Sequence, residues 1–302
     1  MVTVLQEEQW ELLSGADSYV FGNGTQGIIV KGGLDYGSSE IKTQTVDRSQ
    51  SDGSMFGRDT KTGPEWSLTV LVQHGLDVWP VLWEFQAAWD AVSVRAEEGA
   101  VCTLRYRRGG RTIRITGRPQ KCGIVARDKR NHKAQQIACT FQLENPEAYL
   151  EPEDASTRSL TLNLIEAESD GGVVWDDDLT WPIDFDDTSQ ARVGEVTVGG
   201  YRAAPFKVVI HGPVTGTLSK IYLSGDGRAI QTSATLQHDQ TLVIDTHTRT
   251  ITKGGISQAG TLSRTSYLSA RLQPGHQFIK FDAVDPTNTA YAVVTWLDTI
   301  PA

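Results

Sequence analysis

Apolar and polar side chains alternate along most of this sequence, and this two-residue period is the feature that most restricts how the chain folds. Successive side chains of a β-strand point to opposite faces of a sheet, so alternation predicts strands with one buried face. The clearest examples in the first half are residues 28–30, 68–72 and 102–106. The sequence therefore predicts a mainly β protein.

One segment, residues 79–92, has a helical period instead. Apolar residues recur there every three or four positions, which places them on one face of a helix. Pro80 suits the first turn of such a helix, where its missing N–H would have no partner. The residues expected on the apolar face are Leu82, Phe85, Trp89 and Val92.

The second half contains alternating segments and no helical one. Strands at this spacing, bounded by Gly, Pro, Asp or Asn, are typical of a β-sandwich or jelly roll. The composition changes at residues 144–156, which hold two prolines and four glutamates. We therefore predict two domains: an N-terminal β-barrel or sandwich with one helix and a β-hairpin over residues 1–150, and a C-terminal β-sandwich over residues 151–302.

The hairpin is predicted from residues 101–107 and 111–117, which are joined by Arg108, Gly109 and Gly110. It lies in a basic block, because residues 95–133 hold 12 Lys and Arg against 3 Asp and Glu. An acidic block follows at residues 144–188, with 14 acidic residues against one arginine. A solvated face, a salt-dependent protein contact and a nucleic-acid surface all remain open for the hairpin. Only Tyr106 interleaves with the arginines, which is weak support for base stacking.

Gly22, Gly24 and Gly27 fit the G-x-G-x-x-G pattern of dinucleotide-binding loops. That loop binds a pyrophosphate only after a strand and at the start of a helix. Here an expected strand follows the glycines, and no helix begins nearby. We therefore predict a β-turn that requires positive φ, with a second turn at Gly32 and Gly33, and no nucleotide site.

The residues that most often bind metals or catalyse reactions lack the necessary spacing. The three cysteines, Cys102, Cys122 and Cys139, do not form a C-x-x-C motif. The six histidines do not form an H-E-x-x-H motif. We expect buried free thiols, with Cys139 in the core of a strand; a disulfide or a metal site is the alternative. His247, two residues after Asp245, indicates turn or edge chemistry. We expect no catalytic residue, cofactor or metal.

The segment of residues 175–187 contains six aspartates, interspersed with aromatic residues. They lack the D-x-D-x-D-G spacing of a calcium loop, so an acidic solvated loop is the simpler interpretation. Trp175 and Trp181 beside these carboxylates leave a sugar-binding lectin or a glycosidase as alternative functions. The sequence has no run near the roughly 18 apolar residues of a membrane span, and its first ten residues lack the regions of a signal peptide. We expect a soluble chain made in a cytoplasm, without membrane insertion.

Several short sequence segments, none of them specific by itself, follow one another in a characteristic order from about residue 18 to residue 297. A β domain with one helix and a basic hairpin leads to a strand ending in FQLENPEAYLEP. The second half then continues with VGGYRAAPFKVVIHGPVTG, TLVIDTHTRTIT, YLSARLQPGHQFIKF and AVVTWLD. This order resembles the distal tail protein family of long-tailed siphophages, which includes phage minor tail proteins of actinobacterial hosts.

The resemblance implies a structural virion protein and not an enzyme. It implies a homohexameric ring below the tail tube, closed by N-terminal domains, with galectin-like C-terminal sandwiches projecting outward. The implied partners are the tail tube protein and the tail hub or tail-tip protein, with the tape measure and receptor-binding proteins as further candidates. The implied location is the virion tail tip, and no sequence-specific nucleic-acid binding is implied. The resemblance does not account for the acidic residues 166–188.

A ring requires a heterologous interface, in which one patch meets a different patch of the next copy. The separate basic and acidic blocks provide two unlike patches. Trp83 lies off the apolar face of the expected helix, so it either contacts a neighbouring chain or is buried within its own domain. The candidate interface residues are Arg105, Arg107, Arg108, Arg111, Arg114 and Trp83.

Overall fold

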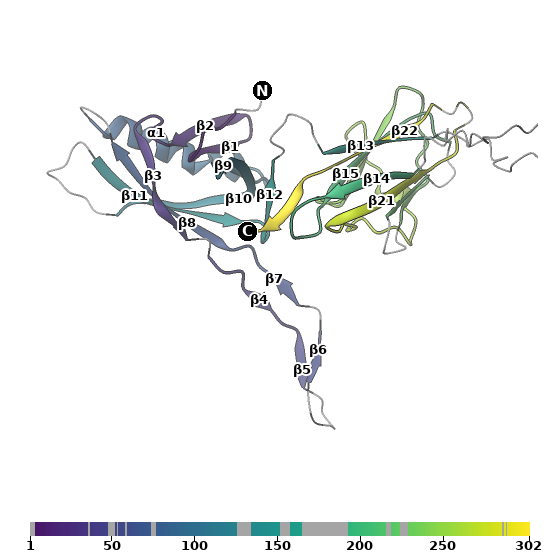
Figure 1. Cartoon of the computed structure of the whole chain (residues 1–302), viewed down its shortest axis with the longest axis horizontal. Helices are drawn as coiled ribbons and strands as arrows, with labels where there is room; N and C mark the ends of the chain where they lie inside the picture. Colours follow the sequence, from purple (N-terminus) through teal and green to yellow (C-terminus); the bar gives the residue numbers. More distant parts are fainter. Residues whose placement is uncertain are drawn as a thin grey trace, which may run out of the picture. The chain divides into compact units, whose positions relative to one another are not determined.

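The computed structural model confirms a mainly β protein (Figure 1). It describes residues 4–35, 37–47, 52, 54–57, 59–73, 77–125, 134–151, 158–164, 193–215, 219–223, 229–285, 287 and 289–302. The chain forms two compact units, Met1–Glu153 with Thr299–Ala302, and Asp154–Asp298. The sequence boundary at residues 150 and 151 did not anticipate the return of the last residues to the first unit.

The first unit is built on one curved sheet that almost closes into a barrel. Every pairing along its main path is antiparallel. The order is β2 (Asp17–Gly22), β1 (Gln9–Ser14), β9 (Cys102–Arg108), β10 (Arg111–Ile124), β11 (Ala134–Leu143), β8 (Glu65–Gln73) and β3 (Ile28–Asp35). Off this path, β12 (Glu147–Leu150) pairs with β10 and with β23 (Asp298–Pro301), which adds the chain's last strand to this unit.

Helix α1 (Trp79–Asp90) provides much of the core of this unit. Its buried residues are Leu82, Phe85 and Trp89, as predicted. The prediction for Val92 is wrong, because this side chain is 65% exposed. Ala91 adopts a left-handed conformation with φ 48°, which ends α1, and the chain resumes as the short helix α2 (Val92–Arg95), which buries Val94 instead.

The predicted basic hairpin is confirmed as β9 and β10, although β10 runs on to Ile124. Arg108 pairs directly with Arg111, so the turn between them is Gly109 and Gly110. These glycines have φ values of 61° and 77°, which L side chains rarely adopt. A register shift between Pro119 and Cys122 marks an irregularity further along β10.

Gly22 is the last residue of β2, and Gly24 and Gly27 lie in the turn that leads to β3. Their φ values of 87°, 76° and 73° agree with the predicted turn. The predicted second turn at Gly32 and Gly33 is wrong. Strand β3 continues through them, since Asp35 still pairs with Ser67 of β8. The register shifts between Lys31 and Asp35, which accommodates the two glycines as an irregularity within the strand.

An arm, defined here as residues 37–63, connects β3 to β8 and was not predicted from the sequence. It consists of two short antiparallel ribbons, which extend away from the curved sheet (Figure 1). The first ribbon pairs β4 (Ile41–Lys42) with β7 (Thr60–Lys61), and the second pairs β5 (Thr45–Asp47) with β6 (Ser54–Phe56). At its base, a Cβ on Gly63 would lie 2.0 Å from the carbonyl oxygen of Leu143. A side chain at Gly63 would therefore displace the arm from the sheet.

The second unit is a β-sandwich, as predicted, with an apolar core between two antiparallel sheets. The larger sheet has the order β13 (Ser159–Asn163), β22 (Tyr291–Trp296), β15 (Phe206–His211), β18 (Thr241–Asp245), β19 (Thr250–Lys253) and β20 (Ile256–Ser257). The smaller has the order β14 (Val193–Val198), β21 (Gly275–Asp282), β16 (Ser219–Leu223) and β17 (Ala229–Thr232). A short 3-10 helix, η1 (Ala259–Thr261), follows β20. After β18, the Asp245 carboxylate accepts hydrogen bonds from the amides of His247 and Thr248, which confirms the turn role of this pair.

Candidate protein–protein interface

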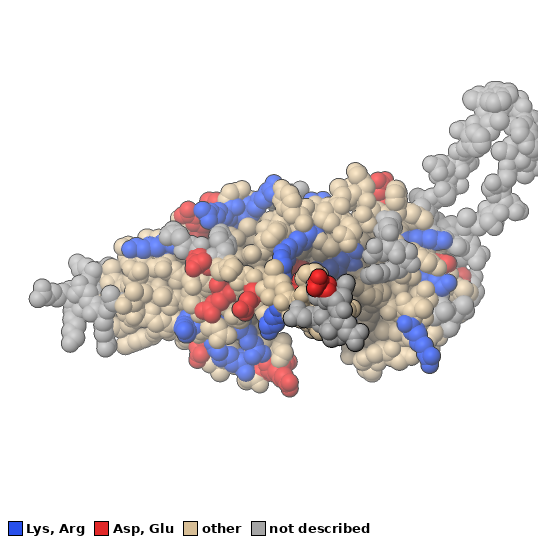
Figure 2. All heavy atoms as spheres, turned by 90° about the horizontal axis from the view of Figure 1, so that it is seen from below, with Lys and Arg blue, Asp and Glu red and all other residues tan. Residues whose placement is uncertain are grey.

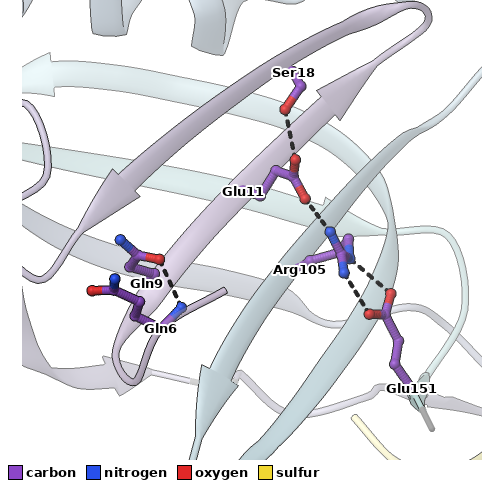
Figure 3. A network of polar contacts seen from close by, with 6 residues as sticks. All are labelled: Gln6, Gln9, Glu11, Ser18, Arg105 and Glu151. Atoms are coloured by element: carbon purple, nitrogen blue, oxygen red, sulfur yellow. Dashed lines mark hydrogen bonds and ion pairs between the residues drawn. The ribbon is translucent and has the colours of Figure 1, made fainter. Parts of the chain in front are cut away.

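Arg105 is the central residue of a buried ion network in the first unit (Figure 3). Its side chain projects from β9 and contacts the Glu11 carboxylate, on the neighbouring strand β1. It also donates two hydrogen bonds to Glu151, from Nε at 2.8 Å and from Nη2 at 2.6 Å. Ser18 donates to the other oxygen of Glu11 at 2.6 Å. The network therefore fixes the chain where it leaves β12.

The burial of Arg105 removes it from the candidate interface. The residue is only 4% exposed, and its guanidinium is used within its own unit. Burial lowers the pKa of Arg105, but the hydrogen bonds and charges of Glu151 and Glu11 outweigh this and hold it above the ordinary value. Alternation placed Arg105 correctly on the face opposite Leu104 and Tyr106. It gave no sign that residue 151 would cover that face.

The other arginines of the hairpin remain accessible to different degrees. Arg108 and Arg111 are exposed on either side of the glycine turn, and Arg107 is half-buried. Arg114 is also half-buried, with its guanidinium carbon 5.9 Å from the centre of the Tyr149 ring, a cation–π contact. Arg107, Arg108 and Arg111 therefore surround the tip of the hairpin.

Glu7 holds this tip in place. Its carboxylate accepts hydrogen bonds from the amides of Gly110 and Gly109. These two bonds lower the pKa of Glu7, and the charges of Arg107 and Arg108 add to the effect. The turn thus presents its arginines from a fixed backbone.

Trp83 is exposed on α1, which excludes the alternative that it is buried within its own domain. Its side chain is 61% exposed, and its ring centre lies 6.2 Å from that of Trp79. Two neighbouring aromatic residues at a helix surface are a common feature of protein contacts. Trp83 therefore remains a candidate interface residue.

The arm exposes apolar side chains that sequence reasoning missed. Phe56 is 84% exposed, and Ile41, Val46 and Met55 are each more than half exposed. Val46 and Met55 are cross-strand partners, so their side chains lie side by side on one face of the ribbon. The only signal in the sequence was an isolated isoleucine, an isolated valine and a Met-Phe pair within a polar stretch rich in Ser, Thr and Asp.

Charges of both signs are interspersed on the face of the molecule drawn in Figure 2. The acidic residues 166–188, with Trp175 and Trp181, lie outside the described residues. Within the described part of the chain, no group of three or more His, Cys, Asp or Glu side chains is placed to hold a metal ion. No helix there combines the length and apolar character needed to span a membrane.

No protein-family model matches the sequence, and no curated protein matches it. Solved structures do match. The crystal structure of the SPP1 Dit protein, described as a paradigm of the hub adsorption apparatus in phages that infect Gram-positive hosts, gives a TM-score of 0.57 at 9% identity. The match covers 96% of this chain and 98% of that one.

The baseplate of phage P2 in its activated conformation provides two further matches. The structure with Ca has a TM-score of 0.51 at 13% identity, covering 97% of this chain and 98% of that one. The structure with Sr has a TM-score of 0.51 at 11% identity, covering 95% and 97%. Over nearly its whole length, the chain therefore has the fold of phage Dit and baseplate proteins.

The ion network predicts a large difference between two arginines of the same hairpin. Arg105→Ala would leave Glu11 buried without its cation, so we expect the free energy of unfolding of the first unit to fall by about 3–5 kcal/mol. Arg111→Ala, at the exposed tip, is the matched control and should change it by less than about 0.5 kcal/mol. Urea unfolding followed by tryptophan fluorescence measures both. Equal effects of the two substitutions would show that the network contributes little.

Proposed function

We propose that this chain is a structural protein of a siphophage tail tip, which forms a ring joining the tail tube to the tail hub and the adsorption apparatus. The observation that supports this most is the fold match, which spans both units and about 96% of the chain, to a Dit protein described as part of a hub adsorption apparatus. The proposed partners are copies of this chain, the tail tube protein and the hub or tail-tip protein. The tape measure and receptor-binding proteins are more distant candidates.

Within this proposal, the first unit closes a homohexameric ring, and the second unit is a galectin-like sandwich at the periphery. A heterologous interface needs two unlike surfaces on one chain. The first unit offers four exposed apolar side chains on the arm, the exposed Trp83 on α1 and an arginine-rich turn. A two-stranded ribbon with exposed apolar residues is marginally stable by itself in water, so a second surface that covers the arm would stabilise it.

The proposal is tested on purified full-length protein. We expect native mass spectrometry to show a mass six times that of the chain, and negative-stain images to show sixfold rings. If the protein stays monomeric at all concentrations, addition of the tail tube or hub protein of the same phage is the second arm of the experiment. A protein that remains monomeric and binds neither partner would overturn the proposed function.

The arm should contribute to assembly more than to folding. Replacing Val46 and Phe56 together by Asp places two charges on the exposed ribbon, so we expect weaker ring formation and an unchanged unfolding transition. Ile256→Asp is the control, because Ile256 is 70% exposed on β20 of the second unit. Sedimentation velocity across a concentration series compares the three proteins. Normal assembly of the arm variant would exclude the arm from the interface.

The arginine-rich turn should affect assembly in a salt-dependent way. We expect the triple replacement of Arg107, Arg108 and Arg111 by Glu to fold normally but assemble poorly at low salt. Single exposed ion pairs contribute only about 0–1 kcal/mol, so several charges must be reversed together to give a clear effect. Native mass at low and moderate salt measures the result. Normal rings at every salt concentration would identify the turn as a solvated face.

A further inference from the structure

Two of the three cysteines lie opposite each other in the sheet of the first unit. Cys122 of β10 and Cys139 of β11 are direct cross-strand partners, and their Sγ atoms are 3.4 Å apart. Partner Cα atoms in antiparallel strands lie about 4.5–5.5 Å apart, which is within the range that a disulfide spans. Both are free thiols in this structure. The backbone therefore already has the spacing that a disulfide requires.

The two thiols differ in accessibility and in acidity. Cys139 is fully buried, whereas Cys122 is half-buried. The Cys139 thiol donates a hydrogen bond to the Cys122 sulfur, and this bond lowers the pKa of Cys122 while it raises that of Cys139. The more accessible sulfur is thus the one that more readily becomes a thiolate, the nucleophile in thiol–disulfide exchange.

Cys102 provides an internal comparison. It is fully buried, and burial raises the pKa of its thiol. Its partner in β10 is Gly117, so no second sulfur lies across from it. The same sheet thus holds one pair of facing thiols, Cys122 and Cys139, and one buried thiol, Cys102, that faces no sulfur across the strands.

We propose that Cys122 and Cys139 are a dithiol–disulfide pair that a small-molecule disulfide oxidises to a covalent cross-link between β10 and β11. The Cys122 thiolate attacks one sulfur of the small disulfide, which forms a mixed disulfide and releases one small thiolate. The Cys139 thiol then loses its proton and attacks the Cys122 sulfur, which releases the second small thiolate. The two cysteines are oxidised by two electrons, and the small disulfide is reduced to two thiols.

The cross-link would lie beside an irregularity of the sheet. Cys122 follows the register shift after Pro119, and the bond would close a covalent loop over residues 122–139. A disulfide of this kind stabilises mainly by restricting the unfolded chain. It would form once the protein leaves a reducing cytoplasm. This inference is independent of the proposed function.

The experiment treats reduced, desalted full-length protein with oxidised glutathione at graded ratios to glutathione. We expect the wild type to lose two hydrogen atoms in intact mass and, when alkylated after denaturation, to show one free thiol in place of three. Peptide mapping should join the peptides of Cys122 and Cys139, and the thermal midpoint should rise. Cys102→Ala is the matched control and should form the same cross-link.

Two further variants identify the order of the steps. Cys139→Ala keeps the nucleophile but removes the resolving thiol, so it should accumulate a glutathione adduct on Cys122. Cys122→Ser, at the half-buried position, should form neither adduct nor cross-link. Three persistent thiols in the wild type would overturn the proposal. A stable glutathione adduct on the wild-type protein, or a cross-link through Cys102, would also overturn it.

Discussion

Burial of the aromatic face of α1 inside the curved sheet is the constraint on which the rest of the first unit depends. The Phe85 ring lies 5.3 Å from that of Phe21, and the Trp89 ring lies 6.3 Å from that of Phe141, in edge-on arrangements. These contacts join α1 to β2 near one edge of the sheet and to β11 on its far side. Because the inner face is filled by the helix, polar side chains of the same strands must lie on the outer face.

Part of that outer face is covered by other residues, as the surroundings of Arg105 show. The end of β12 places Glu151 over it, and β1 places Glu11 beside it. An unpaired charge at this depth would be strongly unfavourable. A buried arginine at position 105 therefore requires the two carboxylates. The basic block is therefore divided by burial: Arg105 stabilises the unit from within, and the arginines around Gly109 and Gly110 are exposed or half-buried at the surface.

Local patterns predicted the elements whose partners are near in sequence. Alternation identified the strands, the spacing of Leu82, Phe85 and Trp89 identified α1, and the paired glycines identified the hairpin turn. Val92 was misplaced because a single left-handed residue, Ala91, interrupts an otherwise continuous helical period. No propensity of alanine indicates that conformation.

The remaining differences depend on contacts between distant segments. The return of β23 to β12 and the cover that Glu151 provides for Arg105 arise from tertiary packing, which a linear pattern does not contain. The arm was missed because its ribbons bury too little to impose an alternating pattern. Of the candidate interface, the sequence located the exposed arginines and Trp83, but it neither excluded Arg105 nor found Phe56.

The relative size of the available interactions indicates what would drive assembly. Full burial of a Val, Met, Ile or Phe side chain contributes about 1.5–3 kcal/mol, whereas an exposed ion pair contributes about 0–1 kcal/mol. Four apolar side chains of the arm and the exposed Trp83 thus outweigh the three arginines of the turn. Charges at such a surface mainly orient partners and exclude wrong ones. Affinity in an assembly of this protein should therefore depend on the arm and α1, and its salt dependence on the turn.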